Sequence, residues 1–518
     1  NPVTGEHPGE YTDKAARAKL HWYGSARFEA TLTGWVADVT NDGYNGVPYV
    51  PFSNGPNPNF DPAPANSAPQ GGFYDTFSAA GVNYGESQQG GANLHLSFQL
   101  GEATLRSITG YANSDTQFGF DLAGGGGDAR PPGLLLASDS NFDQVTQEFQ
   151  LLGTAGEGLF WQLGAYYLHE NGHQQFSGTV PAISTAPSFD EEIDNQTNSY
   201  ALYGEATYQI TDALSLTGGA RWTRDDKSFS DDCTGGFCVD DNGGDASVSL
   251  DDDWNETTFK LGADYQLTDD QLVYLSYSTG FQAGGFRTLC FGDLSSACGG
   301  TAFKPQTVGS YELGWKSDLA DNTVRLNVAT FYARYDDIQQ IVINDAGGFP
   351  IDNIGNVDVY GLELEMTWSP IADLSVFAQS GFQKSNFGSV DPASPPGGLN
   401  GQAPPTDELP SNPRWQGKIG FDYSIPLASK LAFFYGFDLF HSDSYFTESR
   451  NLVKIDDYTR LNGFLGLGAD DRQWQVVLTA KNIADKEDNV SGIFANNVTN
   501  VRTPLPPAEY MLTLRVSY

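Results

Sequence analysis

Four cysteines form two close pairs in the sequence, Cys233 with Cys238 and Cys290 with Cys298. Thiols separated by so few residues can close a local disulfide when a chain folds in an oxidising compartment. The alternative is a zinc site, which needs thiolate and imidazole groups that converge on one point. No histidine lies near either pair. We therefore predict two local disulfides and no resident metal or cofactor.

Aspartate is concentrated between residues 225 and 253, where ten Asp accompany the single cation Lys227. The interpretation we favour is a solvated, mutually repulsive surface in the connections between structural elements. A calcium site is the alternative, because Ca²⁺ binds clustered oxygen ligands. Its weak candidate ligands are Asp240, Asp241, Asn242 and Asp245, which lack the loop length and the closing glutamate of a specific calcium motif.

Histidines, the commonest catalytic bases, are spread singly along the chain. They are His7, His21, His95, His169, His173 and His441. They form no recognisable constellation with serine and an acid, and no convincing cluster at metal-ligand spacing. The sequence therefore predicts that the protein is not an enzyme.

The elements that carry these residues show a two-residue period. From Leu214 to Trp222 every second residue is apolar or small, and the residues between them, such as Ser215 and Arg221, are mostly polar. A strand turns successive side chains to opposite faces, so this pattern predicts a sheet with hydrocarbon on one face and water on the other. The same period recurs from Phe259 to Leu267 and from Leu362 to Trp368.

Composition agrees with one large domain, residues 1–518, that crosses a membrane by strands. Only 39% of residues are apolar and the mean hydropathy is −0.37, since polar lumen residues offset the lipid-facing ones. No apolar run approaches the roughly 20 residues that a membrane helix needs. The formal net charge of −38 excludes nucleic acid as a partner, because a phosphate backbone requires a basic surface.

Nineteen segments have this strand pattern, among them 144–153, 197–210, 214–225 and 255–267. The connections alternate between short turns such as Thr211 to Ala213 and long segments rich in Pro, Gly and Asn. In outer-membrane barrels short turns face the periplasm and long loops face outward, and strand counts are even. Counting back from the last strand puts residue 1 on the outer side, so we expect an odd number of first strands to be missing from this sequence.

The last segment predicts an assembly signal. Its apolar alternation runs through Tyr510, Leu512, Leu514, Val516 and Tyr518 and ends on an aromatic residue. This looks like the C-terminal signal that outer-membrane barrels present to the barrel assembly machinery. An amphipathic edge strand that happens to end on tyrosine is the alternative.

Several runs resemble the strands of TonB-dependent outer-membrane receptors. They are Tyr-Ala-Leu-Tyr-Gly-Glu-Ala-Thr-Tyr at 200–208, Leu-Ser-Leu-Thr-Gly-Gly-Ala-Arg-Trp at 214–222, Tyr-Ser-Thr-Gly-Phe-Gln-Ala-Gly-Gly-Phe at 277–286, Lys-Pro-Gln-Thr at 304–307, Tyr-Glu-Leu-Gly-Trp-Lys at 311–316, Tyr-Gly-Leu-Glu-Leu-Glu at 360–365 and Ala-Lys-Asn-Ile-Ala-Asp-Lys at 480–486. Their order and spacing make the combination specific. Gln306 departs from the glutamate usual before that threonine, which puts one contact at a loop base in doubt.

The resemblance implies an all-β transmembrane antiparallel barrel of about 22 strands, nineteen of them in this sequence, whose lumen is closed by a plug. We expect the plug, the first strands and the segment that contacts the TonB-type energy-coupling complex to lie outside the sequence. The other implied partners are outer-membrane lipid, lipopolysaccharide and the assembly machinery of a Gram-negative outer membrane.

The implied function is active import of a scarce, bulky ligand such as a siderophore or a glycan, bound at the extracellular loops. Loop aromatics are the candidate ligand contacts, although packing within the loops or a girdle at the membrane edge is the alternative. They are Tyr44, Tyr49, Phe52, Phe60, Phe73 and Tyr74. The acidic loops argue against anionic ferric catecholates. A passive porin or a structural, adhesive surface barrel is the competing function.

Charged residues on the predicted lumen face have two possible roles. Arg221, Lys260, Lys316, Glu363 and Glu365 occupy such positions. Cross-strand charge pairs that brace the wall are the role we expect, and direct ligand binding is the alternative.

Overall fold

The computed structural model describes residues 10–41, 47–48, 83–121, 135–179, 187–236, 238, 245–288, 301–342, 350–390, 408–427, 430–451, 453–469, 473–495 and 499–517. Within these ranges no helix is long and apolar enough to cross a membrane. The regular structure described in them is β-structure.

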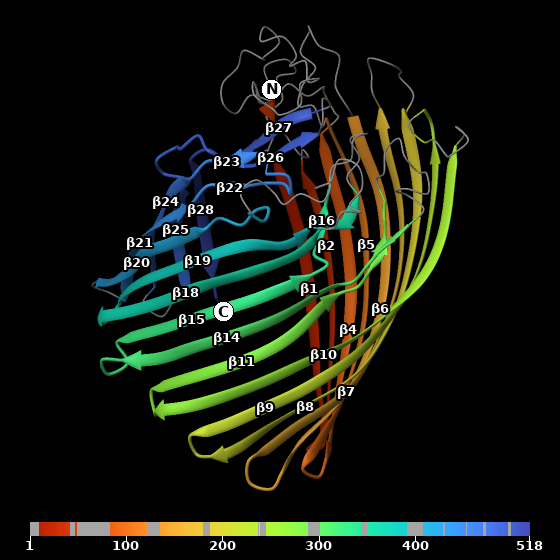
Figure 1. The fold of residues 1–518 in the computed structure, drawn as a ribbon. Coiled ribbons are helices and arrows are strands. Elements are labelled where there is room, and N and C mark those ends of the chain that lie inside the picture. Colours follow the sequence, from red (N-terminus) through yellow and green to blue (C-terminus); the bar gives the residue numbers. More distant parts are fainter. Residues whose placement is uncertain are drawn as a thin grey trace.

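Nineteen strands pair in chain order into one antiparallel sheet (Figure 1). Their bounds are β1 Tyr11–Ser25, β2 Phe28–Asn41, β4 Tyr84–Leu100, β5 Ala103–Asp121, β6 Leu135–Ala155, β7 Leu159–Thr179, β8 Phe189–Thr211, β9 Leu214–Thr234, β10 Ala246–Thr268, β11 Gln271–Gln282, β14 Gln306–Leu319, β15 Val324–Asp336, β18 Gly355–Ile371, β19 Leu374–Val390, β20 Trp415–Leu427, β21 Leu431–Ser442, β24 Tyr458–Ala469, β25 Trp474–Lys481 and β28 Glu509–Val516. All nineteen predicted strands are confirmed, each at its predicted place in the chain.

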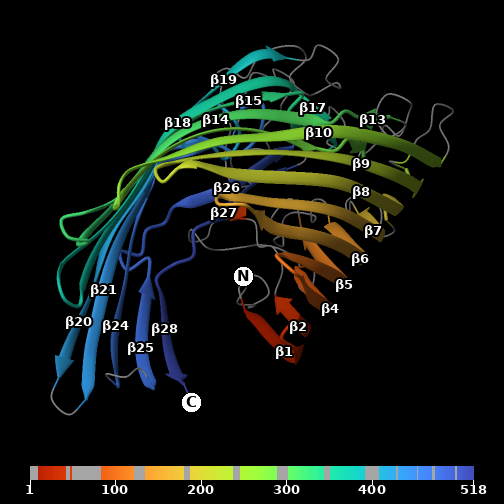
Figure 2. The ribbon, with the colours of Figure 1, turned by 90° about the horizontal axis from the view of Figure 1, so that it is seen from below.

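The sheet curls around an interior, and β1 and β28 are its two free edges (Figure 2). Among the described residues β1 pairs with β2 and β28 pairs with β25, and neither has a second partner in the sheet. Every residue of β1 is exposed. The nineteen strands by themselves therefore form an open curved wall.

At the level of the predicted membrane the two faces of the wall have opposite polarity. Leu202, Trp222 and Leu261 point outward and are 60%, 41% and 59% exposed. Their inward neighbours are polar, as in the cross-strand pair of Tyr203 with Arg221. Such a continuous exposed apolar band is compatible with lipid and not with water.

Six strands extend eight or nine residues further at the loop end than the sequence predicts. They are β4, β6, β7, β8, β9 and β10, and the added segments include 135–143, 172–179, 189–196, 226–234 and 246–254. We call the added parts of β6 to β10 the loop-end extension. The prediction that the aspartates between 225 and 253 lie in loops is wrong for the seven described there on strands, Asp225, Asp226, Asp231, Asp232, Asp251, Asp252 and Asp253.

The physical reason is a reversal of polarity along the strands. From Phe189 to Asp194 burial still alternates, but the buried side chains are the inward ones, Phe189 and Ile193 included, and the outward ones are polar. The lipid-facing pattern that identified the membrane segments stops where this reversal begins. The strand continues because backbone pairing does not depend on which face is apolar.

Nine short strands lie in the long connections near the loop end of the sheet (Figure 1). They are β3 Val47–Pro48, β12 Gly285–Phe286, β13 Ala302–Phe303, β16 Gln339–Ile341, β17 Ile351–Asn353, β22 Tyr445–Phe446, β23 Lys454–Ile455, β26 Asn489–Ala495 and β27 Thr499–Pro504. One apolar cluster under them contains Ile338, Val342, Ile354 and Val357, which are 5% exposed or less. The sequence analysis did not predict these hairpins. We call the four hairpins β12–β13, β16–β17, β22–β23 and β26–β27 the loop tier.

Candidate functional site

The loop tier begins with the hairpin β12–β13, which covers the inner face of the loop-end extension. The ring of Phe286 stacks on Phe229 of β9 with ring centroids 5.5 Å apart, and it meets Trp254 of β10 edge to face at 5.8 Å. Lys227 Nζ donates a hydrogen bond of 2.9 Å to the carbonyl of Gly284. An aromatic stack and the half-buried cation of Lys227 therefore hold this hairpin over β9 and β10.

A buried ion pair joins the first hairpin to the second. Arg287 follows β12 and contacts Asp352 of β17 at 2.5 Å, and the two side chains are 15% and 4% exposed. The side-chain oxygen of Asn353 accepts a hydrogen bond of 2.8 Å from the backbone N–H of Lys304. The side-chain nitrogen of Asn353 donates one of 3.1 Å to the carbonyl of Lys304. The hairpins β12–β13 and β16–β17 therefore form one hydrogen-bonded unit.

Gln306, the departure from the family motif, has a clear role at the base of this unit. Its Oε1 accepts the backbone N–H of Gln339 at 2.7 Å. The side chain of Gln339 in turn donates to the carbonyls of Ala283 and Lys304 at 3.0 and 2.8 Å. The amide at position 306 can thus anchor the loop base without a negative charge.

The hairpins β22–β23 and β26–β27 form a second unit. Tyr445 Oη donates to the carbonyl of Val490 at 2.6 Å, and Thr447 Oγ1 donates to that of Gly492 at 2.8 Å. Burial raises the pKa of the Tyr445 phenol to about 12, so it remains a neutral donor. Val453 and Ile455 are each 1% exposed. The loop tier is thus built from packed structure around the mouth of the curved sheet.

At membrane level the lumen wall carries a polar network that spans β6 to β10. Tyr203 Oη donates to Glu148 at 2.5 Å, and the guanidinium of Arg221 lies 5.5 and 5.6 Å from the ring centroids of Tyr203 and Tyr166. Two further predicted lumen residues, Lys260 and Lys316, also have partners. Their contacts are an ion pair of 3.0 Å between Lys260 and Glu205, and a cation–π contact of 5.3 Å between Lys316 and Tyr274.

The other two predicted lumen charges, Glu363 and Glu365, lie on the same face of β18, opposite Ala329 and Asn327 of β15. The cation–π contacts of Arg221 and Lys316 and the ion pair of Lys260 support the wall-bracing role for these three residues.

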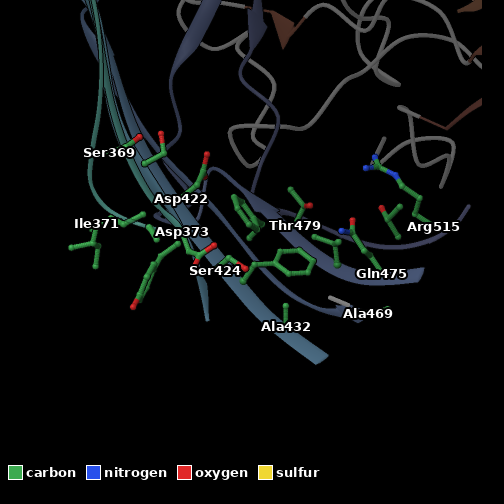
Figure 3. A pocket seen from close by; sticks show the side chains of 18 of the residues that line it. Ser369, Ile371, Asp373, Asp422, Ser424, Ala432, Ala469, Gln475, Thr479 and Arg515 are labelled. Atoms are coloured by element: carbon green, nitrogen blue, oxygen red, sulfur yellow. The ribbon is translucent and has the colours of Figure 1, made fainter. Parts of the chain in front are cut away.

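At the turn end the lumen face lines an open cavity of about 990 Å³ (Figure 3). Asp422 of β20, Gln475 and Thr479 of β25, and Arg515 of β28 contribute polar groups to its wall. Ser375 pairs with Asp422 and Gln475 pairs with Arg515 across the strands, so these groups share one face. The wall that faces the lumen therefore carries polar groups from membrane level to the turn end.

The structure places some of the other predicted site residues and leaves the rest outside the described ranges. Cys233 and Cys238 form a disulfide with Cα atoms 5.4 Å apart, and Asp245 Oδ1 accepts the backbone N–H of Gly235 at 3.3 Å. Tyr510, Leu512, Leu514 and Val516 are between 51% and 72% exposed on β28. Outside the described residues lie Tyr44, Tyr49, Phe52, Phe60, Phe73, Tyr74, Asp240, Asp241, Asn242, Cys290, Cys298 and Tyr518. Among the residues that are described, no group of three or more His, Cys, Asp or Glu side chains has an arrangement suited to a metal ion.

Sequence reasoning missed the residues that tie the loop tier together, Arg287, Gln339, Asp352 and Asn353. Their partners are far apart in the chain, and no periodic pattern marks them. It also missed two buried acids in the loop-end extension, Glu191 and Asp231, which are 0% and 1% exposed. A signal for Glu191 was present, since it lies between Phe189 and Ile193 on the same face of β8.

Comparison with known proteins extends over most of the chain. Residues 31–483 match the family model described as TonB dependent receptor-like, beta-barrel. The pesticin receptor of Yersinia enterocolitica is 31% identical over 239 residues, which cover 46% of this chain and 33% of that receptor. The ferric-pyoverdine 358 receptor of Pseudomonas putida is 24% identical over 362 residues, covering 64% of this chain and 41% of that receptor. The chain therefore spans less than half the length of these relatives.

Solved structures share the fold. The ferric yersiniabactin uptake receptor from Yersinia pestis superposes with a TM-score of 0.79 at 18% identity, over 100% of this chain and 72% of that chain. The siderophore receptor PiuA from Acinetobacter baumannii gives a TM-score of 0.72 at 15% identity, over 100% of this chain and 76% of that chain. At these identities the likeness establishes the architecture of the sheet.

Proposed function

The chain belongs to the TonB-dependent receptor β-barrel family of Gram-negative outer-membrane proteins, and from this premise we propose that it forms the wall of an active-transport receptor. The receptor binds a scarce, bulky ligand at its outer loops and imports it through the barrel. One observation carries the proposal. At membrane level the nineteen-stranded wall is apolar toward lipid and polar toward its lumen, and a loop tier of linked hairpins lies at its outer mouth.

A TonB-type complex in the inner membrane is the proposed source of energy. Family membership supports this partner. A wall of this curvature encloses a wide lumen, so selective passage requires a filled lumen and an energised rearrangement of what fills it. The polar network from Glu148 to Lys260 offers hydrogen-bonding groups to such a filling. Barrel assembly machinery, outer-membrane lipid and lipopolysaccharide remain the other proposed partners. The relatives are named as receptors, and we propose no catalytic activity.

An iron-siderophore complex is the proposed ligand class, with a glycan as the alternative. Relatives named for pyoverdine and catecholate siderophores support the first class. Within the described loop tier and its flanks, Arg287 pairs with Asp352, Arg414 with Glu408 at 2.8 Å, and Arg450 with Glu448 at 3.5 Å. Because these cations already have carboxylate partners, the arrangement favours a neutral or metal-bridged ligand over a polyanionic one.

The test uses the full-length gene with its natural upstream region, expressed in a Gram-negative host that lacks its own siderophore receptors. We expect uptake of radioactive iron bound to one of a panel of siderophores, and loss of that uptake when the host tonB gene is deleted. Steady open conductance of the full-length protein in a planar bilayer, with no TonB-dependent uptake of any panel member or of oligosaccharides, would refute the proposal and favour a porin.

A further inference from the structure

Two acidic side chains are buried on the inner face of the loop-end extension. Glu191 of β8 lies directly opposite Cys233 of β9, and Asp231 lies directly opposite Ile193, so the two acids are diagonal neighbours on one face. Glu191 is 0% exposed and Asp231 is 1% exposed. Diagonal neighbours on one face of a sheet are about 7 Å apart at their backbones, within mutual reach of longer side chains.

Their surroundings are apolar. Phe189, Ile193 and Phe229 are each 2% exposed and belong to the same inner face. The disulfide of Cys233 and Cys238 lies at the end of the same strand, and both cysteines are also 2% exposed. A carboxylate in such a place loses its hydration and gains little in return.

Three of the four carboxyl oxygens have no hydrogen-bond partner within the described part of the chain. They are Oε2 of Glu191 and both Oδ atoms of Asp231. Oε1 of Glu191 lies 3.9 Å from Sγ of Cys233. That sulfur has no proton to donate, because it is part of the disulfide.

No described cation compensates the two acids. Inward residues of the neighbouring strands are Ser138 and Ser140 on β6, Gln174 and Phe176 on β7, and Ala246 and Val248 on β10, and none of these carries a charge. Lys227 of β9 faces the same interior, but four residues separate it from Asp231, about 13 Å along a strand, and its ammonium donates to Gly284. The outward acid Asp232 adds only repulsion.

We propose that Glu191 and Asp231 form a proton-binding pair that makes the loop-end extension sensitive to pH. With protons bound, the pair is neutral and the inner face packs. When the pair ionises, repulsion and the need for hydration separate β8 from β9 at their outer ends. Phe229 lies two residues from Asp231 and stacks on Phe286, so this separation releases the hairpin β12–β13 from the wall.

The direction of the effect follows from the shifted acidities. Burial, reinforced by the neighbouring Asp231 carboxyl, raises the pKa of Glu191 from 4.5 to about 8. Burial, reinforced by Asp232, raises the pKa of Asp231 from 3.8 to about 6. A raised pKa means that the folded extension holds protons which the opened one releases. Packing is therefore strongest below about pH 4 and weakens as the pH rises toward 8.

The inference does not depend on transport, and its test needs no ligand. Hydrogen exchange of the full-length protein in detergent is measured between pH 5 and pH 9 and corrected for the intrinsic dependence of exchange on pH. We expect protection in peptides covering 189–193, 229–233 and 285–286 to fall about tenfold or more across this range. The reason is that raising a pKa by one corresponds to a tenfold change in the equilibrium between the closed and opened extension. Peptides from the membrane level, such as 199–207, serve as the internal reference.

The neighbouring acids provide a matched control. Glu192 and Asp232 lie one residue further along the same strands, are paired with each other in the register, and point outward. The double variant Glu191→Gln with Asp231→Asn should lose the pH dependence, whereas Glu192→Gln with Asp232→Asn should keep it. If the first double variant does not assemble, each single variant should remove part of the dependence.

Three results would overturn the proposal. The first is a wild-type extension whose protection does not change with pH, and the second is an equal pH dependence in the two double variants. The third is a wild-type protein whose protection at pH 8 rises on adding Ca²⁺ or Mg²⁺ and falls with a chelator, while the Glu191→Gln and Asp231→Asn variant does not respond. That third result would make the pair a cation site.

Discussion

The same strands behave differently at two heights. At membrane level β8 and β9 turn Leu202 and Trp222 outward, and the inward pair is Tyr203 and Arg221. Asp194 lies on β8 eight residues before Leu202, in the loop-end extension. There the outward residue is Asp194, and its inward neighbour is the buried Ile193. The two-residue period is continuous, but the polarity of the two faces is exchanged.

The exchange shows that the medium around a strand, and not the strand itself, selects the apolar face. Lipid covers the outward face at membrane level, whereas the hairpin β12–β13 covers the inward face of the extension through Phe286, Phe229 and Trp254. The lumen face is hydrated at one height and packed at the other. Substitutions at matched positions can test each half of this comparison.

The largest effect is expected from Phe229→Ala in the extension. Phe229 is 2% exposed and stacks on Phe286, so truncation leaves a cavity in the packed inner face. We expect a loss of about 3–5 kcal/mol in the local free energy of opening of the extension. Hydrogen exchange of β9 and of the hairpin β12–β13 measures it. The adjacent outward residue gives the control, because Ser228→Ala should change the same free energy by no more than about 0.5 kcal/mol.

A charge on the outward face should separate the two heights. Leu202→Arg places a cation against lipid and should cost about 2–4 kcal/mol near the bilayer midplane. Ser249→Arg places it on the outward face of the extension, where Ser249 is exposed opposite Ser230, and should be almost neutral. Unfolding in urea from lipid bilayers, followed by tryptophan fluorescence, compares the two. Equal costs would mean that lipid also covers the extension.

This exchange of polarity also explains how far the sequence could be interpreted. The lipid-facing alternation located all nineteen strands, because hydrocarbon leaves a periodic signature such as that from Leu214 to Trp222. It failed from Phe189 to Gln196 and from Ala246 to Trp254, where the apolar face depends on a loop folding back from elsewhere in the chain. The ion pair between Arg287 and Asp352 was unpredictable for the same reason, since 65 residues separate its partners.

A smaller effect is expected on the lumen face at membrane level, where aromatic rings lie over glycines. Gly164 is directly opposite Tyr203, and a Cβ at Gly164 would collide with the tyrosine ring. Gly164→Ala must displace that ring from Glu148 and should cost about 1–3 kcal/mol. Gly381 on β19 has no atom within 4 Å of the corresponding position, so Gly381→Ala should be neutral or slightly stabilising. The same urea titration distinguishes the two substitutions.

The smallest effect, and the one that decides whether the membrane-level lumen is wet, concerns the ion pair of Lys260 and Glu205. Its atoms are 3.0 Å apart, but the side chains are 55% and 44% exposed, so water and salt should screen the pair. A double-mutant cycle with Lys260→Ala and Glu205→Ala should give a coupling of about 0.2–1 kcal/mol that shrinks in high salt. A coupling of several kcal/mol that salt does not change would mean that water is excluded from the lumen face here too. The membrane-level wall would then resemble the extension in its inner face and differ from it only in what covers the outside.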